Sequence, residues 1–302
     1  MRASGLLISL LFAISGCKAG GATATPAAEE AATAVDVEEH AFYDGEGRGA
    51  SLAEFVASVA DTDLVGFGEL HHHPVGSRVE LELLQAMAGQ ERPVALAMEF
   101  FEADTQGALD DYLAGRIDEA EFRQRSGRDE SYDASHRPLI ELCKEAGIPV
   151  IAANAPRPLV TAYRKSKLDY PGYLATLTEE ERALLPRSSV PPDDEFKRRF
   201  MALMGPKRGP SFYRSMALWN DAMAESIADF RASHSDHRVL LIVGEFHVAA
   251  HLGTMKEFVA RRPEDSTKVL SMKMVESSAM AFAEDFHGEG DLILAVRPPP
   301  AK

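Results

Sequence analysis

Two stretches with the same ending, LVGFGELH at residues 64–71 and VLLIVGEFH at residues 239–247, decide the fold that the sequence predicts. Each begins with bulky or β-branched apolar residues, which is typical of a buried parallel strand. Each ends in Gly-Glu-apolar-His, so each strand delivers a carboxylate and an imidazole to its carboxyl end. Ligands of open parallel sheets bind in the crevice beyond those ends. We therefore expect the two motifs to meet at one site.

The rest of the chain alternates strand-like and helical patterns, which predicts βαβ units. The other expected strands are Val94 to Glu99, Pro149 to Ala153, Thr267 to Met272 and Asp291 to Val296. The clearest helical patterns are Val79 to Ala88, Leu139 to Ala146 and Phe212 to Phe230. The prediction is an α/β fold with a mostly parallel sheet flanked by helices. A Pro-interrupted helical insertion, about residues 159–210, is expected over the carboxyl edge of the strands.

The amino terminus has the pattern of a bacterial secretory signal. Residues 1–16 carry one cation and a short apolar run, and Ile14-Ser15-Gly16-Cys17 resembles a lipoprotein processing box. We expect cleavage before Cys17, lipidation of Cys17 and a disordered tether over residues 17–40, followed by the α/β domain at 41–302. The expected location is the bacterial cell envelope, attached to the membrane by acyl chains and favouring the outer membrane.

Composition excludes some functions. The net charge of −15 makes nucleic acid an unfavourable partner. The sequence has no large Lys/Arg block, so membrane contact is expected from the acyl chains alone. With Cys17 lipidated, Cys143 has no partner for an intramolecular disulfide, and its helical pattern places it in the core.

Ionisable residues follow several of the predicted strands. Glu69, His71, Glu99, Glu245 and His247 are the candidates for acid/base or catalytic work, and His71, Glu99 and His247 also form a candidate set of metal ligands. Glu69 and Glu245 can instead orient an imidazole or interact with a helix N-terminus. Any one of these residues alone is more simply explained as a solvated strand end.

Further candidates surround the two motifs. His72 and His251 can contribute imidazoles, and Arg157 can hold an anionic group in bidentate fashion or form a salt bridge with a neighbouring Glu. His251 lies four residues after His247, but the Glu required by a zincin motif is missing. The sequence also has no Gly-x-Ser-x-Gly elbow and no P-loop.

The order of five short motifs resembles the ChaN-like haem-binding lipoproteins of the Tiki superfamily. The motifs are Gly68-Glu69-Leu70-His71, Met98-Glu99-Phe100, Asn154-Ala155-Pro156-Arg157, Trp219-Asn220-Asp221 with Met223-Ala224, and Gly244-Glu245-Phe246-His247. The resemblance covers roughly residues 41–296. It implies an α/β fold, surface attachment and haem binding linked to iron uptake. Relatives in the superfamily include metal-dependent proteases and erythromycin esterases.

Two hypotheses follow from the resemblance. In the first, the protein binds haem: His71, His247 or a nearby His or Tyr approaches the iron, with His72 and His251 among the nearby candidates. Arg157 meets a propionate, and the helical insertion supplies apolar walls. A homodimer and an outer-membrane haem receptor are the further partners that this hypothesis allows. In the second, His71, Glu99 and His247 hold Mn, Co or Zn in a hydrolase of the esterase or protease type, with Glu69 or Glu245 as general base.

Overall fold

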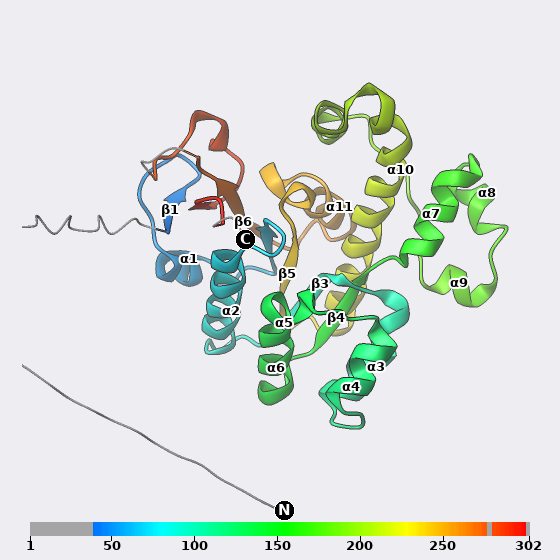
Figure 1. The fold of residues 1–302 in the computed structure, drawn as a ribbon, viewed down its shortest axis with the longest axis horizontal. Helices are drawn as coiled ribbons and strands as arrows, with labels where there is room; N and C mark the ends of the chain where they lie inside the picture. The colour runs from blue at the N-terminus through cyan, green and yellow to red at the C-terminus, as the bar shows by residue number, and fades with distance from the viewer. Residues whose placement is uncertain (1–38, 277–279, 300–302) are drawn as a thin grey trace, which may run out of the picture. The chain divides into compact units, whose positions relative to one another are not determined.

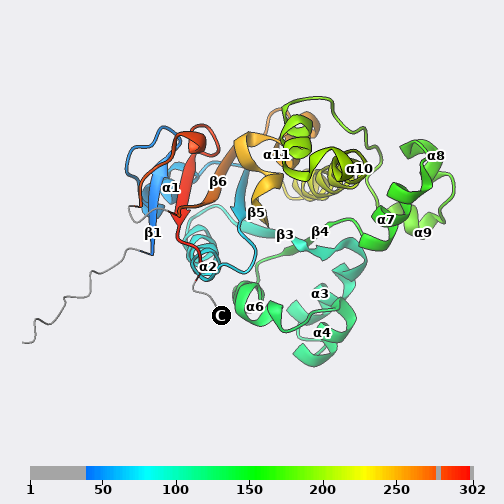
Figure 2. The ribbon, with the colours of Figure 1, turned by 45° about the horizontal axis from the view of Figure 1, so that its top comes forward.

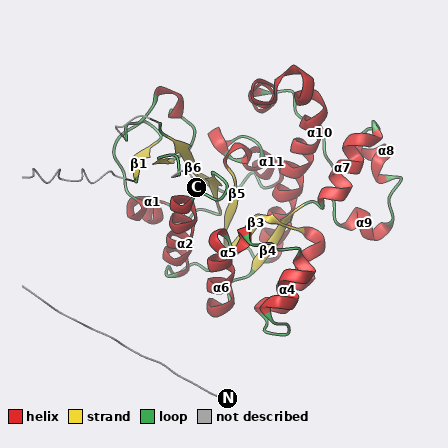
Figure 3. Ribbon diagram, in the orientation of Figure 1, coloured by secondary structure: helices red, strands yellow, loops and turns green. Residues whose placement is uncertain are grey.

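The computed structural model describes residues 39–276 and 280–299. The expected signal, Cys17 and nearly all of the expected tether lie outside these ranges. The described chain forms a seven-stranded sheet flanked by helices, as Figures 1 and 3 show. The predicted α/β class is therefore confirmed. None of the described helices combines the length and apolar character that a membrane span requires.

The sheet has the strand order β1-β7-β6-β2-β5-β3-β4. Its strands are β1 (His40–Asp44), β2 (Leu64–Glu69), β3 (Val94–Glu102), β4 (Val150–Asn154), β5 (Arg238–Gly244), β6 (Thr267–Met274) and β7 (Leu292–Val296). All neighbours are parallel except β1, which pairs antiparallel with β7 at the edge. The sequence pattern did not indicate β1, a five-residue strand whose residues are all only partly buried.

Helices cover both faces of the sheet. The connections after β1, β2 and β3 contain α1 (Leu52–Ser58), α2 (Pro74–Ala88), α3 (Gln106–Leu113), α4 (Glu119–Ser126), α5 (Ser131–Ser135) and α6 (Arg137–Ala146). Apolar side chains of this group share one buried cluster with alternate residues of the central strands, such as Phe67 and Leu240. The other residues of those strands, such as Val239 and Leu241, face α10 (Glu195–Ser233) and α11 (Thr254–Arg261). Figure 2 shows the sheet between the two groups.

The segment predicted as a helical insertion contains α7 (Arg157–Ser166), α8 (Tyr170–Leu174), α9 (Glu179–Ala183) and the first part of α10. Helix α10 is broken at Gly205, whose φ of 70° and ψ of 169° are not helical. A positive φ strains residues with a Cβ, so glycine suits this break, and Pro206 follows it. The first part of α10 packs Phe196 and Phe200 over Phe246, which follows β5.

The two repeated motifs lie on neighbouring strands. Strands β2 and β5 are parallel partners, and Glu69 is in register with Gly244. Gly68 of the first motif leaves space for the second motif, and Gly244 of the second leaves space for the first. A Cβ on Gly68 would stand 2.9 Å from the backbone Cα of Glu245, and a Cβ on Gly244 would stand 2.9 Å from Cε1 of His71. The repeated Gly therefore permits two strand ends to approach closely.

Candidate functional site

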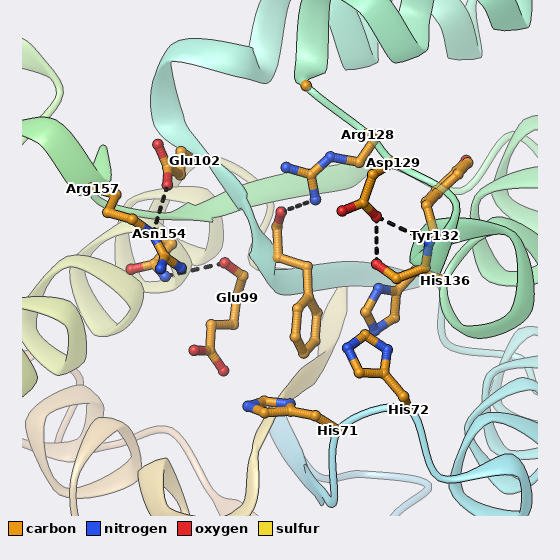
Figure 4. A pocket seen from close by; sticks show the side chains of 13 residues that line it. His71, His72, Glu99, Glu102, Arg128, Asp129, Tyr132, His136, Asn154 and Arg157 are labelled. Atoms are coloured by element: carbon orange, nitrogen blue, oxygen red, sulfur yellow. Dashed lines mark hydrogen bonds and ion pairs between the residues drawn. The ribbon is translucent and has the colours of Figure 1, made fainter. Parts of the chain in front are cut away.

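A cavity of about 310 Å³ opens beyond the carboxyl ends of β2, β3 and β4. Figure 4 shows His71 and Glu99 facing each other on one side, with Arg157 and Arg128 farther up on opposite walls. The lining residues are His71, His72, Glu99, Phe100, Glu102, Gly127, Arg128, Asp129, Ser131, Tyr132, His136, Asn154 and Arg157. The apolar Phe100 comes from β3, and no described residue between 159 and 210 lines this cavity. The apolar walls expected from the insertion are therefore absent from it.

His71 is oriented by a buried carboxylate. Its Nδ1 lies 2.7 Å from Oε1 of Glu69, and the Glu69 side chain is only 3% exposed whereas that of His71 is 53% exposed. The hydrogen bond to Glu69 raises the pKa of His71 above its usual value. With Nδ1 engaged, Nε2 has no hydrogen-bond partner among the described residues. A carboxylate that fixes the ring in this way leaves Nε2 as the electron-pair donor of neutral His71.

Glu69 is held by a second imidazole as well. Burial alone would raise its pKa, but hydrogen bonds from His136 and His71 lower the pKa to about 2. Nε2 of His136 lies 3.4 Å from Oε2 of Glu69, and the His136 ring stacks on Phe100 with 3.9 Å between ring centroids. Glu69 thus links His71 to a buried aromatic support and stays ionised at neutral pH.

Glu80 lies fully buried near Glu69. Burial and the negative charge of Glu69 raise the pKa of Glu80 well above its usual value. Two adjacent carboxylates cannot both ionise at low cost, so Glu69 keeps its negative charge more readily than Glu80 does. The Glu80 side chain is supplied by α2, the helix that follows the first motif.

Glu99 connects the two motifs. One carboxylate oxygen accepts a 2.7 Å hydrogen bond from the backbone N–H of Gly244, and the other lies 3.6 Å from Nε2 of His247. The same carboxylate contributes to the raised pKa of His71. The residues His71, Glu99 and His247 therefore converge across the β2, β3 and β5 strand ends, as the sequence analysis expects.

His247 sits deeper than His71. It is 5% exposed, and burial lowers its pKa. Its Nδ1 lies 2.5 Å from Oδ1 of Asn220 on α10, and this oxygen also accepts a 3.0 Å hydrogen bond from Thr254. His247 is therefore neutral near pH 7, with its Nε2 directed toward Glu99.

The outer part of the cavity carries two arginines. The side chain of Arg157 is 78% exposed and its Nε lies 3.9 Å from Glu102. Arg128 is fixed by the carbonyl oxygens of Ser126 and Phe100, and it forms no ion pair with any described residue. Burial lowers the pKa of Arg128, although a guanidinium remains charged at neutral pH. Two cations thus flank the opening.

The remaining expected residues divide into two groups. His72 lines the cavity with an exposed side chain, a positive φ of 60° and Nδ1 3.2 Å from Oγ of Ser135. Glu245 instead pairs with Lys273 and accepts a 3.1 Å hydrogen bond from Ser271. His251 pairs with Asp291 at 3.1 Å. Neither Glu245 nor His251 lines this cavity.

His136 and Arg128 are site residues that the sequence analysis did not single out. His136 directly precedes Arg137-Pro138 at the start of α6, and the amino ends of crossover helices lie at the carboxyl edge of a parallel sheet. That position was a usable signal for His136. Arg128 follows Gly127, which ends α4 with a φ of 65°, and nothing in its local pattern distinguishes it from a solvated loop residue.

The donor set fits a coordinating ligand at His71. Its Nε2 is open to the cavity, and the cations Arg128 and Arg157 line the same cavity. Within residues 39–276 and 280–299, no three His, Cys, Asp or Glu side chains are grouped closely enough to hold a metal ion as they stand. His71, Glu99 and His247 have suitable ligand chemistry but not, as arranged, that spacing.

Comparison with known proteins fits this geometry. The model of a family described as haem-binding uptake, Tiki superfamily, ChaN, matches residues 55–258. The chain belongs to the ChaN family. The match includes every residue of the cavity as well as Glu69, Asn220 and His247. A search of curated proteins found no match to this ChaN-family chain.

Solved structures share the fold of this ChaN-family protein. ChaN of Campylobacter jejuni, with cofacially bound haem, has a TM-score of 0.64 at 14% identity, covering 86% of this chain and 98% of its own. The type III effector HopBA1 has a TM-score of 0.50 at 14% identity, covering 84% and 96%. The erythromycin esterase EreC in its open conformation has a TM-score of 0.48 at 10% identity, covering 78% of each chain.

Proposed function

We propose that this protein binds haem in the cavity beside His71, with Nε2 of His71 as the iron ligand. The observation that carries the proposal is the Glu69–His71 hydrogen bond of 2.7 Å, which leaves Nε2 free at a cavity wall. Bound haem would supply its iron and macrocycle. The chain itself orients the imidazole, places Phe100 along the wall and offers cations to the propionates.

Arg157 and Arg128 are the groups for those propionates. Arg157 is exposed and can move, whereas Arg128 is already fixed by two carbonyl oxygens. A guanidinium matches a carboxylate in bidentate geometry. Their positions on opposite walls favour a ligand with two separated negative groups (Figure 4).

The cavity covers only part of such a ligand. Its volume of about 310 Å³ is at the lower limit of small-molecule pockets, and many of its lining residues are polar. A macrocycle held here would leave one face uncovered. A second copy of the chain is the partner we propose for that face, and the cofacial haem of the Campylobacter jejuni protein supports this idea.

The proposed cellular role is haem or iron uptake at the bacterial cell envelope. The family description supports uptake, and the Ile14-Ser15-Gly16-Cys17 box supports attachment through acyl chains on Cys17. A surface lipoprotein of this kind would receive haem from, or pass it to, an outer-membrane receptor.

Hemin titration of the purified chain tests the proposal. We expect a Soret band that saturates as hemin is added to the unmodified protein. His71→Ala should lower the hemin affinity at least about 10-fold, because removal of a group that merely orients a ligand already costs about that much. His72→Ala tests whether the neighbouring imidazole of His72 is the iron ligand instead of His71. His234→Ala is the matched control, because this exposed histidine lies before β5, at the opposite end of the strand. An unchanged titration in His71→Ala would overturn the assignment.

A metal-assisted hydrolase is the second candidate. Two imidazoles have their Nδ1 atoms anchored by oxygen acceptors, Glu69 for His71 and Asn220 for His247, and both approach Glu99. Anchored imidazoles of this kind are typical of metal ligands. Calorimetry with Mn²⁺, Zn²⁺ or Co²⁺ distinguishes the candidates, because stoichiometric binding lost in His247→Ala supports the hydrolase.

A further inference from the structure

A basic surface lies away from the haem cavity, where α7 meets the second part of α10. Figures 1 and 2 show these two helices side by side. The Arg164 guanidinium stands 4.3 Å from the centre of the Phe212 ring, and Arg214 donates a hydrogen bond to the carbonyl of Leu168. We call this surface the α7–α10 basic patch; its cations are Arg164, Lys165, Lys167, Lys207, Arg208 and Arg214.

The cations of this patch are not neutralised. Within the described residues, none of the six forms an ion pair with a carboxylate. The acids closest in sequence are engaged elsewhere: Asp169 caps α8 by accepting from Gly172, and Asp221 pairs with Arg261. Six unpaired cations are unusual in a chain of net charge −15.

Exposed apolar side chains accompany the cations. Leu168 is 41% exposed and Phe212 is 37% exposed, although both are large apolar residues. Leu203, at the break in α10, is 68% exposed. Apolar side chains flanked by Lys and Arg are typical of surfaces that lie in the interface of an anionic membrane, where the ring or aliphatic chain enters and the cations meet phosphates.

We propose that the α7–α10 basic patch docks on an anionic phospholipid surface. The net charge of −15 opposes approach to such a surface, whereas the cations of this face favour it, so docking would fix the orientation of the domain. The sequence shows no Lys/Arg block because the cations come from two separate segments, residues 164–167 and 207–214, which only the fold brings together. The proposal is independent of haem binding.

Vesicle sedimentation tests the docking. The full chain carrying Cys17→Ala, which removes the acylation site, is mixed with vesicles of phosphatidylcholine alone or with phosphatidylglycerol. We expect binding only to the anionic vesicles, and its loss at about 1 M salt, where the Debye length falls to about 3 Å. Each cation at an anionic surface contributes roughly a factor of five, so Lys207→Gln/Arg208→Gln should bind about 25-fold more weakly.

Two further double variants, made in the same Cys17→Ala chain, separate the effect of the patch from that of net charge. Arg116→Gln/Arg125→Gln removes the same two charges from arginines that pair with Asp111, and it should change binding less than about 2-fold. Lys165→Gln/Lys167→Gln should weaken binding as the α10 pair does. Equal binding to both vesicle types overturns the proposal, as does equal loss in the control. Absence of binding to the anionic vesicles also overturns it and would favour an acidic protein as the partner of this patch.

Discussion

The ring of His71 lies against Gly244, at the point where a side chain on residue 244 would begin. A Cβ there would stand 2.9 Å from Cε1 of His71 and 3.4 Å from Oε2 of Glu99. The second motif therefore leaves space for the imidazole of the first. This contact explains in physical terms why the second motif begins with Gly, and it ties the ligand-binding geometry to the pairing of β2 with β5.

Gly244→Ala should displace His71 more than it unfolds the protein. The added methyl meets the end of a half-exposed side chain, which can rotate away, so we expect a loss of stability of about 1 kcal/mol and a much larger loss of hemin affinity. Gly107→Ala is the control, because a Cβ at Gly107 meets nothing within 4 Å. Thermal melts and hemin titrations of both variants check this, and full hemin affinity in Gly244→Ala would contradict it.

Glu69→Gln should weaken hemin binding by roughly 10- to 100-fold, the usual effect of removing a group that orients a ligating imidazole. The amide also removes the charge that raises the pKa of His71, so NMR titration should show that pKa falling. Glu141→Gln is a suitable control, since Glu141 accepts a hydrogen bond from Tyr112 and is not part of the cavity. An unaltered His71 titration would rule out the orienting role of Glu69.

Glu80 should make the protein less stable as the pH rises. Its pKa is raised in the folded state, so above the ordinary value near 4.5 the folded protein holds a proton that the unfolded chain has released. The free energy of unfolding therefore falls with increasing pH over this window. Glu80→Gln, which mimics the protonated acid, should flatten the decline of the free energy of unfolding above the ordinary pKa of 4.5. Urea unfolding at several pH values measures the free energy of unfolding of both proteins. If it changed with pH in the same way in both, Glu80 would not be the source of the decline.

His247→Ala should keep the hemin band. His247 is buried behind Glu99 and hydrogen-bonded to Asn220, so its removal leaves His71 and the cavity wall in place. The expected cost is about 1–3 kcal/mol of stability, from the lost hydrogen bond to Asn220 and the lost packing, with hemin affinity changed less than about 3-fold. Loss of the band in a folded His247→Ala protein would show that hemin binding depends on His247 and would contradict the assignment of His71 as the iron ligand that acts without it.

The sequence predicted much of this fold because the central strands are continuous apolar runs and the connecting helices have apolar faces. Strand β1 was missed because its residues are half-buried at the sheet edge, where no apolar alternation is needed. The length of α10 was underestimated because its prolines, Pro206 and Pro210, are typical of a loop. They follow the break at Gly205, where the helix begins again.

The site was predictable only in part. The repeated motif identified His71 as a neighbour of His247, and the apolar strand that ends at Glu99 added this carboxylate, since parallel strand ends meet at one edge. It gave no sign that Glu245 would pair with Lys273, a residue of β6, because that contact depends on which strand lies beside β2. Arg128 likewise reaches the cavity through long-range packing of the segment between β3 and β4, which leaves no periodic pattern.

The central claim is that Nε2 of His71 binds haem iron in the cavity between Phe100, Arg128 and Arg157. The most direct measurement is a crystal structure of the hemin complex with anomalous scattering recorded at the iron absorption edge. The account predicts one iron peak per chain, bonded to Nε2 of His71, with the propionates toward the two arginines. An iron peak elsewhere, for example on His251 or His287, would contradict it.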